Sequence, residues 1–271
     1  MRKDETRLFS ALLRHWRTRR GMSQLDLAVA ADVSSRHISF LETARAQPSR
    51  EMVLVLAAAL DVPLRDQNVL LDSAGFTSAF AEPPLEGGMP PPIAQAIDRM
   101  LAQHEPFPML VLTRTYDVLR INEGARRLLS RMILDPAALP DPPNLLRALM
   151  DPRLGRPFVV DWERVARVLL ARIHRESLQR PSDGPIVALL EDLMGYPDVP
   201  ASLRQPDFSL PSDATFTLRL RRDDLDLAFL TTLTVFSAPQ NVTLDELRLE
   251  SYFPLDEATA RACQRLAASE G

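Results

Sequence analysis

Residues 23–42, SQLDLAVAADVSSRHISFLE, constrain the fold of this chain more than any other stretch. Ser23 can accept hydrogen bonds from the first turn of a helix, and the small Ala28 on its apolar side lets a second helix pass close by. Ser34 can cap that second helix, and Ile38 with Leu41 can hold it against the first. The stretch therefore predicts two short helices crossed at a tight turn.

Such a pair is typical of a helix-turn-helix DNA reader, although the same periodicity also fits an amphipathic pair in a helical bundle. The charge distribution favours the DNA reader. Residues 1–50 hold ten Lys and Arg against five Asp and Glu, a net +5, whereas the whole chain carries −4. A basic head on an acidic remainder indicates a phosphate-binding module joined to a domain of another kind.

Apolar periodicity and capping residues predict that the head is an all-α domain of five helices. Ser49 can cap the fourth helix, Pro63 suits the first turn of the fifth, and Gly75 suits its end. The expected helices span residues 6–19, 23–31, 34–43, 49–60 and 63–74.

Residues 12–76 resemble the lambda-repressor-like helix-turn-helix domain of xenobiotic-response-element regulators (the XRE family), and the run FLETARAQPSREMVLVLAAALDVPL, residues 40–64, resembles the MmyB-like branch. Asp32 and Ala44 stand where that family usually has glycine. Aspartate tolerates a left-handed backbone, whereas alanine pays about 1 kcal/mol for it, so two shapes stay open for the loop at Ala44, that of the family or a different one. The resemblance makes Gln24 a phosphate contact. Arg36 becomes the base contact, because its fork matches the two acceptors of guanine.

One candidate DNA-contacting residue starts the first helix of the pair, and the others lie on the outer face of the second helix and around its two ends. They are Gln24, Ser34, Ser35, Arg36, Ser39, Thr43 and Arg45. Each of them also has an ordinary interpretation as a solvated surface residue.

A proline-rich run at residues 82–92, EPPLEGGMPPP, predicts a linker between a domain at 1–81 and a second domain at 93–271. The second domain mixes helical and alternating patterns. Helices are expected at 93–103, 123–132, 144–150, 161–179, 185–194 and 256–268, and strands at 109–113, at 118–121 and three times within 215–254. The pattern predicts an α+β domain with a five-stranded antiparallel sheet.

This region resembles the PAS-like ligand-binding domain of the MmyB-like regulators over residues 106–129, 161–173 and 232–254. The resemblance implies a hydrophobic cavity that holds a fatty-acid-like molecule, whereas the ordinary interpretation of the same side chains is core. The candidate pocket residues are Leu110, Leu112, Phe158, Trp162, Val165, Leu169, Phe216, Leu218, Phe229 and Leu233.

Two polar groups in this domain have structural explanations. Asn122 would suit the mouth of a pocket, but we favour its role as the N-cap of the helix at 123–132. A buried Trp162 would need an acceptor for its indole N–H, which places it at a pocket wall or an interface.

Enzyme signatures are absent from the sequence. The four histidines never form the pair spaced by four with a glutamate between that a zinc peptidase needs, and no phosphate loop or GxSxG elbow occurs. The single Cys263 excludes an internal disulfide. No run of 18 apolar residues occurs and the N-terminus is charged, so we expect a cytoplasmic protein without membrane contact, catalytic residues, metal or cofactor.

These features together predict a one-component bacterial transcription regulator. The head would bind double-stranded operator DNA as a homodimer, and the second domain would sense a small hydrophobic ligand. In the alternative hypothesis, the second domain is only a dimerisation or partner-docking module with a filled core.

Overall fold

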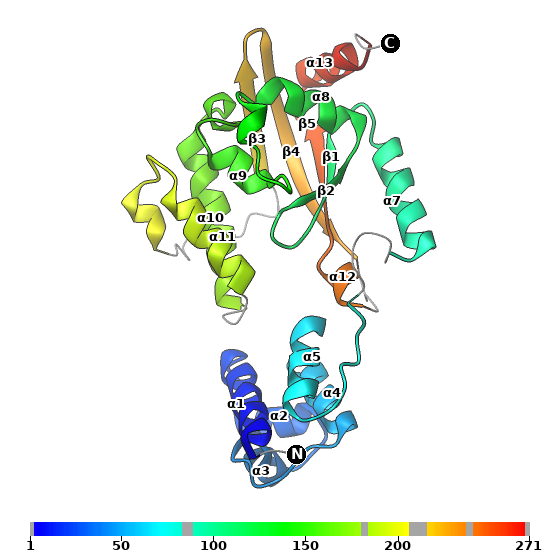
Figure 1. Ribbon diagram of the computed structural model, residues 1–271, viewed down its shortest axis with the longest axis vertical. Coiled ribbons are helices and arrows are strands. Elements are labelled where there is room, and N and C mark those ends of the chain that lie inside the picture. Colours follow the sequence, from blue (N-terminus) through cyan, green and yellow to red (C-terminus); the bar gives the residue numbers. More distant parts are fainter. Residues whose placement is uncertain (1–2, 83–88, 180–183, 206–215, 237–240, 269–271) are drawn as a thin grey trace. The chain divides into compact units, whose positions relative to one another are not determined.

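The computed structural model describes residues 3–82, 89–179, 184–205, 216–236 and 241–268 (Figure 1). The chain divides into two compact units. The first comprises Met1–Met89 with Phe236–Asp245, and the second comprises Pro90–Val235 with Glu246–Gly271. The multidomain organisation is as predicted, but Phe236–Asp245 groups with the first unit although we expected it in the second domain. Of the predicted linker, residues 83–88 lie outside the described residues.

The first unit contains the five predicted helices. They are α1 (Lys3–Arg19), α2 (Gln24–Ala30), α3 (Ser35–Glu42), α4 (Arg50–Ala59) and α5 (Leu64–Ser73). Ser23, Ser34 and Ser49 cap α2, α3 and α4, each accepting a hydrogen bond from the backbone N–H three residues later. The helices enclose one apolar core, in which Leu27, Ile38 and Leu41 are fully buried.

The turns on either side of α3 both adopt a left-handed backbone, including the loop at Ala44 whose shape the sequence left open. Asp32 has φ 52° and Ala44 has φ 57°. The amide of Val33 donates to the carbonyl of Ala28 at 2.9 Å across the first turn, and the amide of Arg45 donates to that of Phe40 at 2.8 Å across the second. The second of these bonds holds Ala44 in a conformation that costs an alanine about 1 kcal/mol.

The first unit is completed by a short helix from far along the chain, α12 (Val242–Asp245), which packs against α5. Val242 is fully buried, and its amide donates to the carbonyl of Ala81 at 3.0 Å. We expected a strand here, and that prediction was wrong. The side chain of Asn241 accepts from the amide of Leu244 at 2.9 Å and so caps a helical turn instead.

Asn68 on α5 fixes the segment that α12 contacts. Its Oδ1 accepts from the amides of Ala79 and Phe80, both at 3.0 Å, and its Nδ2 donates to the carbonyl of Phe80 at 2.8 Å. The chain after α5 is thereby held along that helix, where Ala81 bridges Asn241 in parallel.

The second unit is built on the predicted five-stranded antiparallel sheet, in the order β2-β1-β5-β4-β3. Its strands are β1 (Met109–Leu112), β2 (Val118–Ile121), β3 (Phe216–Arg222), β4 (Leu225–Val235) and β5 (Arg248–Pro254). The register pairs Leu218 with Phe229 and Thr231 with Tyr252, so these side chains share one face of the sheet.

In Figure 1, α10 and α11 lie to the left of this sheet and α7 lies to its right. The helices are α7 (Pro91–Gln103), α8 (Glu123–Met132), α9 (Leu145–Met150), α10 (Trp162–Gln179), α11 (Gly184–Gly195) and α13 (Glu257–Ala268), with 3-10 turns η1 (Pro136–Ala138), η2 (Arg156–Phe158) and η3 (Ala201–Arg204). Val165, Leu169 and Ile173 of α10 join the main core with the alternating buried residues of β3 and β4.

Asn122 is the N-cap of α8, which confirms the structural interpretation of this residue. Its Oδ1 accepts from the amides of Ala125 and Met109, both at 2.9 Å, and its Nδ2 donates to the carbonyl of Phe107 at 2.8 Å. The side chain thus ties the start of α8 to β1.

Candidate DNA-binding surface

Helix α3 has one buried side and one exposed side. Ile38 and Leu41 are fully buried, and a helix turns about 100° per residue, so Arg36, Ser39, Phe40 and Thr43 fall on the opposite side. Arg36 and Thr43 are exposed, whereas Ser39 and Phe40 are half-buried. The stripe is short and mixes a cation, hydroxyls and a ring, which suits contact with base edges and phosphates.

Arg36 is presented on this stripe without a competing acid. Its guanidinium carbon lies 5.1 Å from the centroid of the Phe40 ring. Among the residues that the structure describes, no carboxylate forms an ion pair with Arg36. Its hydrogen-bond donors therefore face solvent and can meet an external acceptor.

The other predicted contact residues lie around the stripe in different circumstances. Ser35 and Arg45 are exposed at the two ends of α3. Two hydroxyls already serve the helix, because Ser34 Oγ accepts from the amide of His37 and Thr43 Oγ1 donates to the carbonyl of Ser39 at 2.7 Å. A hydroxyl in such a bond can still accept a further one.

Gln24 belongs to a buried network that the sequence did not reveal. Its Nε2 donates to Glu42 at 2.8 Å, and Arg17 donates to the two carboxylate oxygens of Glu42 at 2.5 and 2.9 Å. Burial opposes ionisation of Glu42, but the hydrogen bonds from Arg17 and Gln24 outweigh it and lower its pKa. The sequence did carry one sign that Glu42 is buried, because Glu42 follows Ile38 by four residues and so lies on the same side of the helix, toward the core.

The arginine cluster after residue 13 is less available for DNA than its sequence suggests. Arg17 is taken by Glu42, and Arg20 donates to the carbonyl of Leu60 at 2.7 Å and pairs with Asp61 at 3.0 Å. Arg19 stacks its guanidinium 4.7 Å from the centre of the Trp16 ring. Many of the hydrogen-bond donors of these arginines therefore hold α1 against the rest of the first unit.

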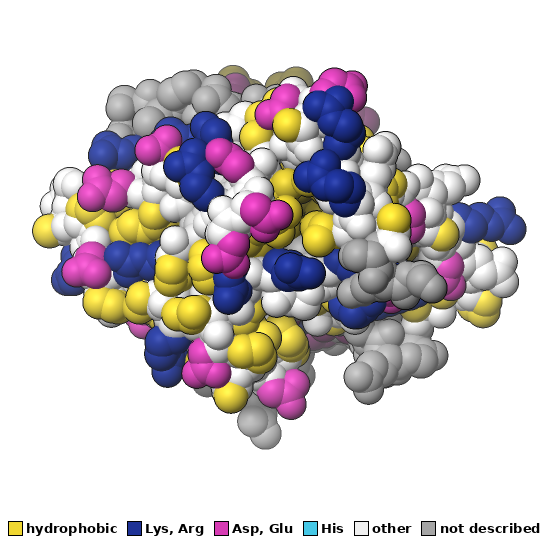
Figure 2. Space-filling view, turned by 90° about the horizontal axis from the view of Figure 1, so that it is seen from above, with side chains coloured by type: hydrophobic (Ala, Val, Ile, Leu, Met, Phe, Trp, Pro, Cys, Tyr) yellow, Lys and Arg dark blue, Asp and Glu magenta, His cyan; other side chains and the backbone are white. Residues whose placement is uncertain are grey.

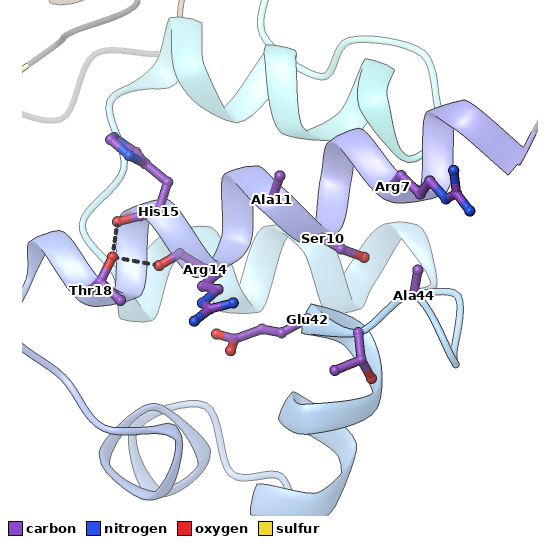
Figure 3. A pocket seen from close by; sticks show the side chains of 9 residues that line it. Arg7, Ser10, Ala11, Arg14, His15, Thr18, Glu42 and Ala44 are labelled. Carbon is purple, nitrogen blue, oxygen red and sulfur yellow. Dashed lines mark hydrogen bonds between the residues drawn. The ribbon is translucent and has the colours of Figure 1, made fainter.

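A groove of about 550 Å³ runs between α1 and the end of α3 (Figure 3). Arg7 and Arg14 supply its cations, and the guanidinium of Arg14 points toward Glu42. Because Arg17 already pairs with Glu42, the two exposed arginines leave this groove with positive charge. The remaining lining residues are Ser10, Ala11, His15, Thr18, Thr43 and Ala44. Thr43 belongs to both the groove and the exposed stripe, so the two surfaces are continuous.

Comparison with known families accounts for both units. A helix-turn-helix domain family matches residues 8–70, and the family of MmyB-like transcription regulator ligand binding domains matches residues 93–266. The chain belongs to the MmyB-like transcription regulators. Among curated proteins, none matches this MmyB-like regulator. Its first unit contains a helix-turn-helix domain.

One solved structure that resembles this MmyB-like regulator is titled "Structure of an RNA-binding Light-Oxygen-Voltage Receptor". The identity is 14%, the TM-score is 0.27, and the match covers 95% of this chain. The chain spans 65% of that receptor's length. Among the residues that the structure describes, no helix of the MmyB-like regulator has the length and apolar character needed to cross a bilayer.

The ten predicted pocket residues of the MmyB-like regulator are mostly packed into the main core of the second unit. Seven of them are buried there, namely Leu110, Leu112, Val165, Leu169, Phe216, Leu218 and Phe229, and Phe158 and Trp162 pack against that core. Leu233 is half-buried near the end of β4. The indole N–H of Trp162 donates to the carbonyl of Leu149 at 3.1 Å, which supplies the acceptor that a buried indole requires.

An apolar cavity of about 40 Å³ lies between α8, α9 and the sheet. Of the ten predicted residues, only Leu218 lines it. Ligand sites for drug-sized molecules are commonly about 300–1,000 Å³, so this cavity would have to open to admit a fatty-acid chain. Its other lining residues are Leu128, Leu129, Met132, Ile133, Leu145, Ala148, Leu149, Gly155, Leu220 and Tyr252.

The second unit also contains a buried polar cluster that we did not predict. Tyr116 donates to Glu176 at 3.0 Å, and Arg248 donates to the same carboxylate at 3.1 and 2.9 Å. Burial raises the pKa of the nearby Glu250 above its ordinary value, although Arg172 and the Tyr252 hydroxyl act in the opposite direction.

The face of the molecule seen in Figure 2 intersperses basic and acidic side chains, with apolar ones between them. Such mixing creates no field of a single sign that would attract DNA over long distances. Among the described residues, no group of three or more His, Cys, Asp or Glu side chains is placed to hold a metal ion.

Proposed function

We propose that this regulator binds operator DNA by inserting α3 into the major groove. The observation that carries the proposal is the exposed stripe of α3, on which Arg36 stands without an acidic partner. Arg7 and Arg14 in the adjoining groove would contact phosphates, which position the protein without reading the sequence.

Two copies of the chain would act together on an inverted repeat. Helix α3 has eight residues and is therefore about 12 Å long, so it can reach only a few base pairs. Twofold symmetry doubles these contacts and places two reading helices about one turn of DNA apart. We propose a homodimer for this reason.

The second unit would report a small apolar molecule, and its family supports this role. A fatty-acid-like ligand would enter by widening the cavity beside Leu218 and Tyr252. It could shift the regulator only by preferring one conformation over another. The closely packed core instead favours a second candidate, in which this unit is an assembly or docking module. In either case the protein would act in the bacterial cytoplasm.

Sequencing the DNA that the purified full-length protein retains would define the operator. On that operator, Arg36→Ala should lower affinity by about fivefold or more, because a bidentate arginine–guanine pair discriminates by about 1–3 kcal/mol. Weak binding to unrelated DNA at low salt should remain. Arg261→Ala removes the same charge from an exposed site on α13 and should leave the operator preference unchanged. Equal loss on all sequences would assign Arg36 to a phosphate.

Lipid extracted from the purified protein separates the two roles of the second unit. Mass spectrometry should find a long-chain acid if this unit is a sensor, and added acid should raise the melting temperature of its transition. No bound lipid and no thermal shift would favour the docking module.

A further inference from the structure

Phe40 occupies an unusual place for a large apolar side chain. It lies on the exposed side of α3, four residues after Arg36, whereas Ile38 and Leu41 carry the contacts of this helix with the core. The ring is half-buried, and it is not among the side chains that form or pack against the core of the first unit. The fold therefore does not account for a phenyl ring at this position.

Arg36 and Phe40 form a preorganised pair on the reading helix. The guanidinium lies over the ring at 5.1 Å from its centroid, within the range of a cation–π interaction. This contact restricts the rotamers of Arg36 before DNA arrives, so less entropy is lost when its fork meets a base. The ring also keeps an apolar surface beside that fork.

We infer that this pair reads a two-base-pair element, in which Arg36 binds guanine and Phe40 packs on the methyl group of a neighbouring thymine. The inference rests on the proposed DNA-binding function. In the major groove, guanine offers two acceptors to arginine, and the thymine methyl is the one apolar group that a base presents. A phenyl ring has no donor or acceptor, so the methyl is its only specific partner there.

The spacing of the pair places the two bases next to each other. Base pairs are stacked about 3.4 Å apart along the duplex, so two steps cover about 7 Å. The separation of 5.1 Å between guanidinium and ring falls between these values. Because the guanidinium and the ring are closer together than two base-pair steps, we assign the thymine to the base pair adjacent to the guanine.

The test uses the full-length protein and the operator defined by its own retained DNA. Replacing each guanine by 7-deazaguanine removes one acceptor and identifies the base that Arg36 reads, since the effect should vanish in Arg36→Ala. Replacing each thymine by uracil then removes only the methyl group. At the adjacent thymine, uracil should weaken binding by about fourfold, the value of one buried methyl group.

The same uracil substitution should have no effect on the Phe40→Ala variant. The affinity of that variant for the thymine operator should already be at least about fourfold lower, because it loses the methyl contact and the ring that orders Arg36. Val55→Ala shortens another exposed apolar side chain, on α4, and should keep the full uracil effect. Circular dichroism of each variant checks that the head is folded.

Several outcomes would overturn the inference while leaving DNA binding intact. These are an operator in which the guanine read by Arg36 has no thymine beside it, uracil substitutions that are all neutral, or a uracil effect of the same size in Phe40→Ala. Failure of the proposed function looks different, because the protein would then retain no preferred sequence at all.

Discussion

The two units each bury a glutamate, and they shift its pKa in opposite directions. In the first unit, Glu42 receives two hydrogen bonds from Arg17, and its pKa falls despite burial. In the second unit, burial dominates at Glu250, where Arg172 and Arg248 act through space, and its pKa rises. The comparison teaches that a buried carboxyl stays ionised when an arginine donates two hydrogen bonds directly to it, and that arginines acting only through space are not enough.

Removal of Glu42 should change the free energy of unfolding more than any other substitution proposed here, and it tests the first half of this comparison. Glu42→Ala leaves Arg17, whose side chain is 11% exposed, without its anion, and such a loss should destabilise the first unit by about 3–5 kcal/mol. Urea unfolding followed by circular dichroism measures the change. Glu51→Ala removes an exposed carboxylate from α4 and should change stability by less than about 0.5 kcal/mol. A small effect at Glu42 would show that the pair is not needed for folding.

Val242→Ala should destabilise the first unit, although residue 242 lies in the part of the sequence that we assigned to the second domain. Val242 is fully buried, so its truncation should cost about 2 kcal/mol. Hydrogen exchange should accelerate in α5 and at residues 79–82 and remain unchanged in the sheet. Val69→Ala trims a valine of α5 that is 44% exposed and serves as the control. Faster hydrogen exchange in the sheet alone would contradict the grouping of α12 with the first unit.

The opposite pKa shifts predict opposite responses to pH. Glu42 has a lowered pKa, so its contribution to stability is present above its ordinary value of 4.5 and is lost as the pH falls through the folded pKa. Glu250 has a raised pKa, so its contribution is present below 4.5 and is lost as the pH rises through the folded pKa.

Glu250→Gln should therefore stabilise the second unit relative to the wild type, and this advantage should grow as the pH is raised from about 4.5. Thermal unfolding between pH 4 and 8 measures it. An advantage that is constant over this range would show that Glu250 does not titrate differently in the folded and unfolded states.

The smallest effect should come from the turn after α3. Ala44 has φ 57°, and glycine adopts this conformation freely, so Ala44→Gly should stabilise the first unit by about 1 kcal/mol or slightly less. Ala11→Gly, at an exposed position in the middle of α1, should destabilise it by about 0.5–1 kcal/mol. Denaturant midpoints of the two variants should therefore move in opposite directions, and a shared direction would refute the strain at Ala44.

Local signals made most of the fold predictable. The serine caps of α2, α3 and α4, the left-handed turn at Asp32 and the alternation of β3 and β4 all depend on residues close in sequence. The exposed side of α3 follows from helical periodicity in the same way, so Arg36 and its neighbours could be selected without a structure.

Contacts between residues that are far apart in the sequence could not be predicted. Arg17 meets Glu42 over 25 residues, and nothing in either local pattern reveals that the two side chains share a buried bond. Arg248 and Glu176 are 72 residues apart, and no local pattern around either residue indicates their contact. The size of a cavity depends on how many side chains from distant parts of the sequence fill it. The close packing around Leu218 could therefore not be predicted from a local sequence pattern.

The position of α12 also bears on how regulators of this architecture can exchange parts. A protein cut within residues 82–92 would separate the head from Val242 and Leu244, and would leave the apolar surface of α5 open to water. Chimaeras that graft this head onto another sensor should therefore carry the connection between β4 and β5 with it. Recombination at the proline-rich boundary alone would yield a head that lacks a fragment of its own interior.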